Sequence, residues 1–271
     1  QAEVDVTFTN RTTSTTLKMP AFWNGGEEWK VRFAPTECGI WDYTVSTKGT
    51  DLGLAGKTGT LACNSYKGDL EIYKRGFLKT EKDTRYFLYN DGTPFFYLGD
   101  THWSLGSESL DMVKTITAHR AKQGYTVIQS EPLGASFTVE DGMDEGDIIG
   151  FKANDQKFQA IAAEGLVHAN AQFFFPHSMN TCIENHGGYS SRDVSLSVNG
   201  SSVTVKDLSN QAKNYLKKLS RYWVARYSAY PVMWTLGQEV DNDFYWDRSE
   251  HLKWNFVNNP YKLVAEYIAQ Y

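Results

Sequence analysis

The N-terminal quarter of the chain contains short runs in which hydrophobic and polar residues alternate. Examples lie at residues 4–9, 29–33 and 40–45, and a period of two residues is typical of half-buried β-strands. Turn-forming residues separate the runs, and no apolar spacing there fits a helix. The pattern predicts an antiparallel β-sandwich over residues 1–66. Because about five strands can be distinguished, fewer than the ~7 of an immunoglobulin-like sandwich, we expect an N-terminally clipped domain.

From residue 67 the pattern changes to strands that alternate with helices. Apolar runs on either side of the Asn90-Asp91-Gly92 turn predict a β-hairpin over residues 85–98. Four apolar strands are predicted, the first of which is the second strand of this hairpin, with amphipathic helices between and after them. The strands are predicted at residues 94–98, 125–128, 166–175 and 232–236, and the helices at residues 107–124, 154–165, 207–230 and 260–271. Such alternation indicates a parallel sheet covered by helices.

Two further features complete the predicted organisation. The polar, turn-prone residues 64–69 predict a short linker, which divides the chain into domains at residues 1–66 and 67–271. An Asn-Gly turn predicts a β-hairpin inserted at residues 194–205, between the third strand and the third helix. Insertions of this kind often carry specificity in βα folds.

Composition and charge exclude several classes of protein. The chain has 41% hydrophobic and 22% charged residues, which is ordinary for a folded globular protein, and its net charge of −5 includes no basic cluster for nucleic acid. Its apolar runs are too short to span a bilayer. Aromatic residues make up 14% of the chain, enough to fill a core and still stack on an apolar ligand face such as that of a sugar.

The three cysteines, Cys38, Cys63 and Cys182, lack the spacing of a zinc or thioredoxin-like motif, so we predict no metal site. Sequence spacing leaves two alternatives open for Cys38 and Cys63. They could form a disulfide, if the protein is secreted, or remain two free thiols. We also predict no cofactor.

Polar residues gather directly after the predicted parallel strands, where ligand sites lie in such folds. These candidate residues are Asp100, His102, Trp103, Glu131, His177, Gln238, Glu239 and Asp241. Each also has an ordinary structural explanation, as a helix cap, a buried histidine, a packed aromatic ring or a solvated acid. Glu239 is the hardest to explain by folding alone, because it closely follows an apolar strand.

Two segments carry a resemblance to a known family. Residues 86–103 (YFLYNDGTPFFYLGDTHW) and 226–239 (RYSAYPVMWTLGQE) resemble the apiosidase-like glycoside hydrolases, which are clan A (β/α)8 TIM barrels. Residues 29–35 and 39–43 look like the β-sandwich domain of unknown function that precedes such barrels. Together they span nearly the whole chain. The resemblance implies a secreted or cell-surface enzyme that cleaves an oligosaccharide or polysaccharide of plant or microbial origin.

The resemblance also implies roles for individual residues. In clan A the residue that ends the fourth strand is the general acid/base, usually preceded by Asn, and here this position falls on Glu239, preceded by Gln238. A retaining glycosidase needs a second carboxyl about 5–5.5 Å away as nucleophile, and in the clan this residue ends the seventh strand. The other candidates, Asp100, His102, Trp103, Glu131, His177, Gln238 and Asp241, are then expected to bind the substrate.

The length of the chain limits how much of such a barrel it holds. Four βα units take about 145 residues as far as Glu239, so eight would need well over 300. We therefore expect only strands one to four of the barrel, with the nucleophile outside this sequence. A larger protein or a second polypeptide would supply the rest, and the isolated chain would be inactive.

Two other functions compete with glycoside hydrolysis. A non-catalytic carbohydrate-binding or adhesion protein would use the aromatic residues to bind glycan without cleaving it. A doubly wound nucleotide-binding domain is disfavoured by the missing phosphate loop. A second carboxylate near Glu239 would separate the first two functions.

Overall fold

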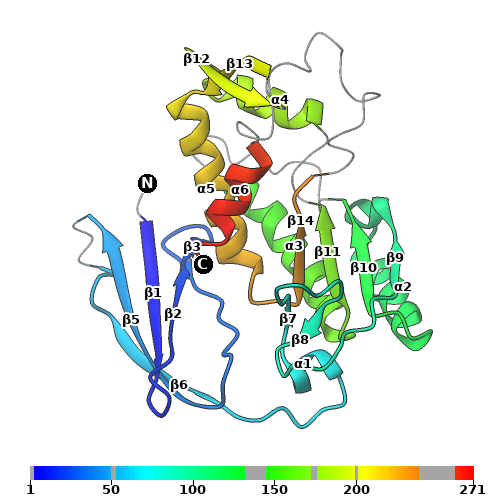
Figure 1. The fold of residues 1–271 in the computed structure, drawn as a ribbon. Helices are drawn as coiled ribbons and strands as arrows, with labels where there is room; N and C mark the ends of the chain where they lie inside the picture. Colours follow the sequence, from blue (N-terminus) through cyan, green and yellow to red (C-terminus); the bar gives the residue numbers. More distant parts are fainter. Residues whose placement is uncertain (1–2, 50–52, 132–144, 172–175, 199–200, 238–259) are drawn as a thin grey trace. The chain divides into compact units, whose positions relative to one another are not determined.

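The computed structural model describes residues 3–49, 53–131, 145–171, 176–198, 201–237 and 260–271 (Figure 1). The chain divides into two compact units. Unit 1 comprises residues 1–170 and 222–233, and unit 2 comprises residues 171–221 and 234–271. In the described parts of the chain, no helix combines the length and the hydropathy needed to cross a bilayer.

Unit 1 begins with a four-stranded antiparallel sheet. Its strands are β1 (Glu3–Asn10), β2 (Thr16–Pro20), β5 (Gly39–Lys48) and β6 (Thr58–Cys63), in the order β2-β1-β5-β6. The two-residue alternation read from the sequence sets which face is buried, since Val6 and Phe8 of β1 lie in the core. The strands β3 (Phe22–Trp23) and β4 (Trp29–Lys30) form a separate antiparallel pair.

The core of this sheet is closed by an irregular segment. Val6, Phe8 and Trp41 form its buried centre, and Val31 and Phe33 from the segment after β4 pack against them. The rings of Phe8 and Phe33 stack with centroids 3.9 Å apart. The predicted antiparallel sheet is therefore confirmed, while its pairing with a second complete sheet as a sandwich stays a prediction.

The segment between the N-terminal sheet and the βα elements follows the sequence pattern in part. Residues 64–70, between β6 and α1 (Glu71–Arg75), form neither helix nor strand. The domain boundary at residue 66 stays a prediction. The turn of the hairpin expected over residues 85–98 is present: the N–H groups of Tyr89 and Phe95 donate 2.9 Å hydrogen bonds to the carbonyls of Thr93 and Phe87, and Leu88 and Pro94 form one antiparallel bridge. The strand β8 (Leu88–Tyr89) also pairs with β7 (Leu78–Lys79).

Unit 1 also carries most of a parallel sheet with the strand order β14-β11-β10-β9. Its strands are β9 (Gly99–Thr101), β10 (Val127–Ser130), β11 (Val167–Ala171) and β14 (Val232–Thr235). The first strand was predicted at residues 94–98, a few residues before the observed β9. The helices α2 (Leu110–Lys122) and α3 (Glu145–Ala163) confirm the expected alternation.

The order of these strands distinguishes a barrel from a doubly wound sheet. Each successive strand is added on the same side of the one before, whereas a doubly wound sheet reverses its order at a switch point. Strands β9, β10 and β11 pair in parallel. The domain is therefore of the TIM-barrel type, with N-terminal β-structure before it.

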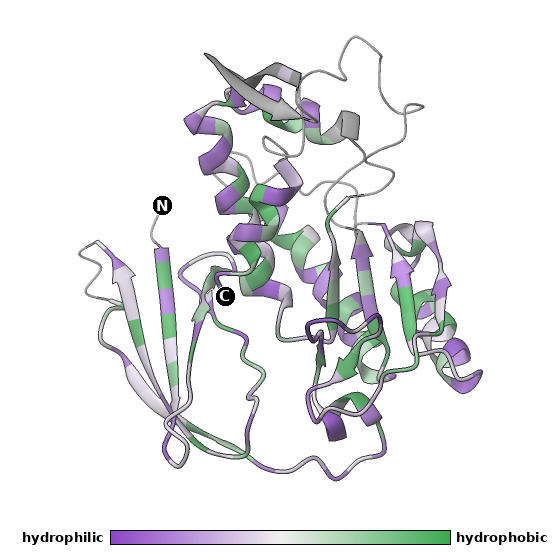
Figure 2. Cartoon of the chain, viewed as in Figure 1, coloured by the Kyte–Doolittle hydropathy of each residue, from purple (hydrophilic) through white to green (hydrophobic). Residues whose placement is uncertain are grey.

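The two faces of the parallel sheet differ in their environment. Gly99, Val127 and Val167 share one row of the register, and the next row of Asp100, Ile128 and His168 points to the opposite face. Val127, Val167 and Ala169 pack against Ile72 of α1 and against Phe95. We call the face of the sheet that carries these three residues the inner face. The hydropathy colouring in Figure 2 shows the apolar residues of these strands.

An arginine cluster joins the N-terminal segment to the βα elements within unit 1. Arg226 of α5 (Asn210–Tyr227) is fully buried and donates two hydrogen bonds to the Asp155 carboxylate of α3, of 2.8 and 2.7 Å. Arg32, which follows β4, binds the same carboxylate at 3.0 and 2.6 Å. Asn24 accepts a further bond from Arg226, and the Arg226 guanidinium lies 4.7 Å from the ring centroid of Phe22.

Unit 2 contains the predicted hairpin and a helix that the sequence pattern did not indicate. The strands β12 (Tyr189–Val198) and β13 (Ser201–Leu208) pair antiparallel and confirm the insertion at residues 194–205, although its Asn-Gly turn lies outside the described residues. The helix α4 (Pro176–Asn185), like α6 (Pro260–Ile268), begins at a proline. Proline favours the first turn, where its missing N–H costs no helical hydrogen bond.

Candidate active site

Three of the predicted site residues meet at the carboxyl ends of β9 and β10. The short 3-10 helix η1 (Trp103–Ser107) lies against the end of β10. The backbone N–H of His102 donates to the carbonyl of Gln129 at 2.8 Å, and the N–H of Glu131 donates to the carbonyl of Trp103 at 3.3 Å. These two bonds bring His102, Trp103 and Glu131 together.

The side chains of this group can meet a ligand. Trp103 is 40% exposed, and His102 and Glu131 are half-buried. The Nε2 atom of His102 lies 3.6 Å from the Glu108 carboxylate, and it is a buried atom without a hydrogen-bond partner. The exposed indole of Trp103 suits a sugar, which offers an apolar ring face.

Asp100 points away from the inner face of the sheet. Its carboxylate accepts a 2.8 Å hydrogen bond from Nε of Arg120, which belongs to α2. It therefore lies on the face that the helices cover. This placement explains Asp100 as the partner of a structural ion pair, and its predicted role in substrate binding finds no support in the geometry.

Two residues outside the predicted set occupy the inner face at the same end. Thr101 and Gln129 are register partners in β9 and β10, one residue beyond the row of Asp100 and Ile128. Thr101 is exposed and Gln129 is half-buried. The signal that could have found them is the period of two along each strand, which puts neighbouring residues on opposite faces.

A buried polar cluster at the ends of β10 and β11 was also missed. Ser130, His168 and Asn170 are buried. The Ser130 hydroxyl lies 2.8 Å and the Asn170 amide nitrogen 3.2 Å from Nε2 of His168. Burial lowers the pKa of His168 to about 3, so the imidazole is neutral at neutral pH. It packs on Phe158 of α3 with ring centroids 4.8 Å apart, which indicates a structural role.

The buried imidazole of His168 predicts a pH-dependent stability. A histidine in the unfolded chain has a pKa near 6.5, so between pH 6.5 and 3 the unfolded state binds the extra proton. The free energy of unfolding should then fall as the pH falls through this window, at up to about 1.4 kcal/mol per pH unit. Between pH 7 and 5, urea unfolding should show the wild type losing about 2 kcal/mol more than His168→Gln. Equal losses would contradict the burial of a neutral imidazole.

The remaining predicted residues cannot be placed. Gln238, Glu239 and Asp241 belong to residues 238–259, which lie outside the described residues. His177 lies in the first turn of α4, and its side chain is not described. The convergence of Glu239 with His102, Trp103 and Glu131 therefore stays a prediction.

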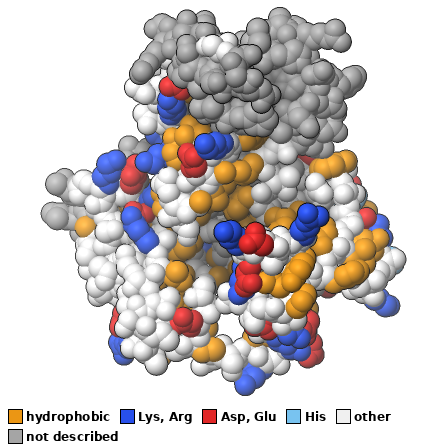
Figure 3. All heavy atoms as spheres, in the orientation of Figure 1, with side chains coloured by type: hydrophobic (Ala, Val, Ile, Leu, Met, Phe, Trp, Pro, Cys, Tyr) orange, Lys and Arg blue, Asp and Glu red, His pale blue; other side chains and the backbone are white. Residues whose placement is uncertain are grey.

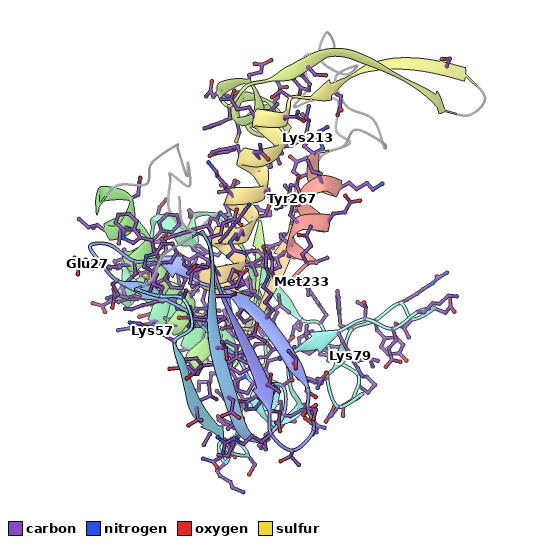
Figure 4. All side chains as sticks on the ribbon, turned by 90° about the vertical axis from the view of Figure 1, so that its left-hand side faces the viewer. Glu27, Lys57, Lys79, Lys213, Met233 and Tyr267 are labelled. Atoms are coloured by element: carbon purple, nitrogen blue, oxygen red, sulfur yellow. The ribbon has the colours of Figure 1, made fainter. Side chains whose placement is uncertain are left out.

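A cavity of about 280 Å³ lies at the opposite end of the parallel strands. Its lining includes Leu78, Lys79, Val167, Val232 and Met233, and Figure 4 labels Lys79 and Met233. Val167 and Val232 are the first residues of β11 and β14. Conserved chemistry in TIM barrels sits at the carboxyl ends of the strands, so this cavity belongs to the stabilising end.

The described residues offer no ready metal centre. Among them, no group of three or more His, Cys, Asp or Glu side chains could hold a metal ion. The side chains of His102 and Glu108 lie close together near the carboxyl ends of the strands. Two ligands are fewer than the three or four protein ligands of a zinc site.

Similar proteins place these observations in a family. Residues 81–270 match the family described as Apiosidase-like, catalytic domain, and residues 1–48 match the family described as Domain of unknown function (DUF5060). None of the curated protein sequences matches the chain.

The chain also resembles solved structures. A candidate glycoside hydrolase from Bacteroides vulgatus is 16% identical with a TM-score of 0.61, over 99% of this chain and 49% of that one. A protein described as a glycoside hydrolase is 19% identical with a TM-score of 0.46, and the match covers 73% of this chain and 39% of that one. A family 5 glycoside hydrolase from Bacteroides vulgatus is 17% identical with a TM-score of 0.44, and the match covers 76% of this chain and 39% of that one. The chain spans about half the length, or less, of these proteins. The resemblance read from residues 86–103 and 226–239 is thus confirmed, and the chain belongs to the apiosidase-like catalytic domain family.

Proposed function

We propose that the chain forms the N-terminal part of a retaining glycoside hydrolase that cleaves a plant or microbial glycan. The observation that carries this proposal is the family match over residues 81–270, which includes every candidate site residue. The meeting of His102, Trp103 and Glu131 at the carboxyl ends of β9 and β10 supports it, since TIM-barrel enzymes act at that end. An extracellular or cell-surface location is part of the same proposal.

Glu239 is the proposed general acid/base. In a retaining mechanism it protonates the departing glycosidic oxygen while a second carboxylate attacks the anomeric carbon, and it then activates the water that releases the sugar. We propose that this nucleophile lies beyond residue 271. The candidate glycoside hydrolase from Bacteroides vulgatus that matches 99% of this chain is about twice as long as the part that the two proteins share. This length leaves room for further strands.

The edge of the described sheet supports the proposal that further strands complete the barrel. β9 is an outer strand, and the residues before it are exposed although they are large and hydrophobic. Phe96 is 74% and Tyr97 43% exposed. Figure 3 shows such side chains reaching the surface on the part of unit 1 that holds the parallel sheet. In a closed barrel the first strand pairs with the eighth, whose neighbouring structure would cover such residues.

The substrate contacts proposed from the geometry differ from those expected from the sequence alone. Trp103 would stack on a sugar ring, and His102 and Glu131 would bind hydroxyl groups. Thr101 and Gln129 join them because they lie on the inner face. His177, Gln238 and Asp241 remain proposed contacts, while Asp100 is assigned to its ion pair with Arg120.

Gln129 and Asp100 give a matched test of these assignments. Gln129→Ala is expected to raise KM about 5–10-fold in the complete protein, because one hydrogen bond to the substrate is lost. Asp100→Asn, one register row away on the other face, should change KM by less than about twofold and lower thermal stability instead. Initial-rate kinetics and thermal melts measure both effects. A larger KM effect for Asp100→Asn than for Gln129→Ala would reverse the assignment of the faces.

Hydrolysis itself is tested with a panel of aryl glycosides and plant and microbial polysaccharides. The complete protein should release sugar from at least one of them, whereas the 271-residue chain alone should release none because it lacks the second carboxylate. Binding without hydrolysis by the complete protein would instead favour a carbohydrate-binding or adhesion function. Hydrolysis by the chain alone would place both carboxylates within these residues, with Glu131 or Asp241 as the candidate nucleophile.

A further inference from the structure

Two cysteines distant in sequence lie side by side in the N-terminal sheet. Cys63 ends β6, and its register partner in β5 is Gly39, the residue after Cys38. Burial raises the pKa of the Cys63 thiol, and so do the charge of Cys38 and a hydrogen bond to it. The register thus places Cys38 next to Cys63 at the paired ends of β5 and β6.

The backbone around Cys38 is fixed in this position. Gly39 adopts φ = +129°, which L side chains rarely adopt, and a Cβ there would lie 3.2 Å from the buried side chain of Asn10. That side chain donates a 3.1 Å hydrogen bond to the carbonyl of Cys38. The neighbouring carbonyl of Glu37 accepts a 3.0 Å bond from the Trp41 indole. Cys38 is thus held before any covalent bond forms.

We propose that Cys38 and Cys63 form a disulfide that ties the edge strand β6 to β5 when the protein meets a disulfide oxidant such as oxidised glutathione. The exposed thiolate of Cys38 attacks one glutathione sulfur and releases one reduced glutathione. The Cys63 sulfur, after losing its proton to solvent, then attacks Cys38 and releases the second. One oxidised glutathione is consumed, and two reduced molecules are formed. The bond resolves the alternative that sequence spacing left open.

The position of the bond suggests its purpose. In the described sheet β6 pairs with β5 alone and is the last strand in the order. A cross-link at the end of such a strand holds it against fraying and against pairing with another chain. The closed loop of about 24 residues includes the turn between the strands, so the bond also restricts the unfolded state.

Cys182 provides an internal control. It is buried in unit 2, and burial raises the pKa of its thiol to about 11. A thiol with this pKa is a poor nucleophile at neutral pH. Oxidised glutathione should therefore leave Cys182 as a thiol in the folded protein.

Peptide mapping tests the proposal directly. The complete protein is folded with oxidised glutathione, its remaining thiols are alkylated in denaturant, and it is digested with trypsin without reductant. Cleavage after Lys and Arg puts Cys38 in peptide 33–48, Cys63 in peptide 58–67 and Cys182 in peptide 158–192. We expect the first two peptides as one species, two hydrogen masses below their sum, and peptide 158–192 alkylated. Separate alkylated peptides 33–48 and 58–67, a stable glutathione adduct on Cys38, or a link to Cys182 would each overturn the proposal.

Variants separate the bond from incidental oxidation. Reduction should lower the Tm of the wild type by about 5–10 °C and leave the Tm of Cys38→Ser, Cys63→Ser and the double variant unchanged. Cys63→Ser should retain glutathione on Cys38, because the resolving thiol is missing. A wild-type Tm that does not respond to reduction would contradict a role in holding β6.

Discussion

Replacing Glu239 with Gln should lower kcat of the complete protein by about 10²–10⁴-fold while its fold stays intact. The amide keeps the shape of the carboxyl group but cannot donate a proton to the departing glycosidic oxygen. The loss should be smallest for nitrophenyl glycosides, because nitrophenolate departs with little protonation. Steady-state kinetics with aryl and unactivated glycosides, together with a thermal melt of each variant, measure this difference.

Asp243→Asn is the matched control for Glu239→Gln. It removes a carboxylate four residues further along the same segment and should leave kcat within about twofold. A loss in Glu239→Gln that is the same for good and poor leaving groups would argue against general acid catalysis by Glu239. Retained activity on unactivated glycosides would transfer that role to Glu131 or Asp241.

Asp155→Asn should give the largest loss of stability, about 3–5 kcal/mol in the free energy of unfolding. The carboxylate holds two guanidinium groups, those of Arg32 and Arg226, and Arg226 is fully buried. Asparagine keeps the size of the side chain but leaves the buried cation without a counter-charge. Urea denaturation at constant pH measures the loss.

A second arginine–aspartate pair provides the control for burial. Arg11 binds Asp42 through two hydrogen bonds of 2.8 Å, a geometry close to that of Arg226 with Asp155. Its side chains are 57% and 47% exposed. Asp42→Asn should therefore leave stability almost unchanged, because an exposed ion pair contributes little. Similar effects in the two variants would contradict the role of burial.

The arginine cluster also couples two parts of unit 1. Arg32 follows β4 in the N-terminal segment, whereas Asp155 and Arg226 lie on α3 and α5. Since one carboxylate serves both arginines, the N-terminal sheet and these helices stabilise each other. The N-terminal segment is thus an integral part of the fold of unit 1.

The sequence predicted the order of elements because hydrophobic periodicity is a local property. Alternation identified the N-terminal strands, and apolar runs between helical segments identified the parallel sheet and its inserted hairpin. It did not identify α4, whose residues 176–178 were expected to follow a longer strand. The first parallel strand was also placed a few residues too early. The pairing of β8 with β7 was not anticipated, because it depends on residues outside the hairpin.

The direction of individual side chains was harder to predict. A shift of one residue in strand position exchanges the two faces of a sheet, so Asp100 was expected at the site while Thr101 and Gln129 were overlooked. The pairing of Asp155 with Arg226 spans 71 residues of sequence and has no local pattern. His168 and Asn170 interrupt an apolar strand, which is a visible signal, but its meaning depends on the helix that covers them.

The configuration of the first sugar released tests the central proposal most directly. The complete protein is incubated with an aryl glycoside that it cleaves, and proton NMR follows the anomeric signal before mutarotation. The paired carboxylates of a retaining enzyme predict that the product first appears with the anomeric configuration of the substrate. Release of the opposite anomer would contradict the retaining mechanism, and absence of hydrolysis with every glycoside and glycan tested would contradict the assignment as a glycoside hydrolase.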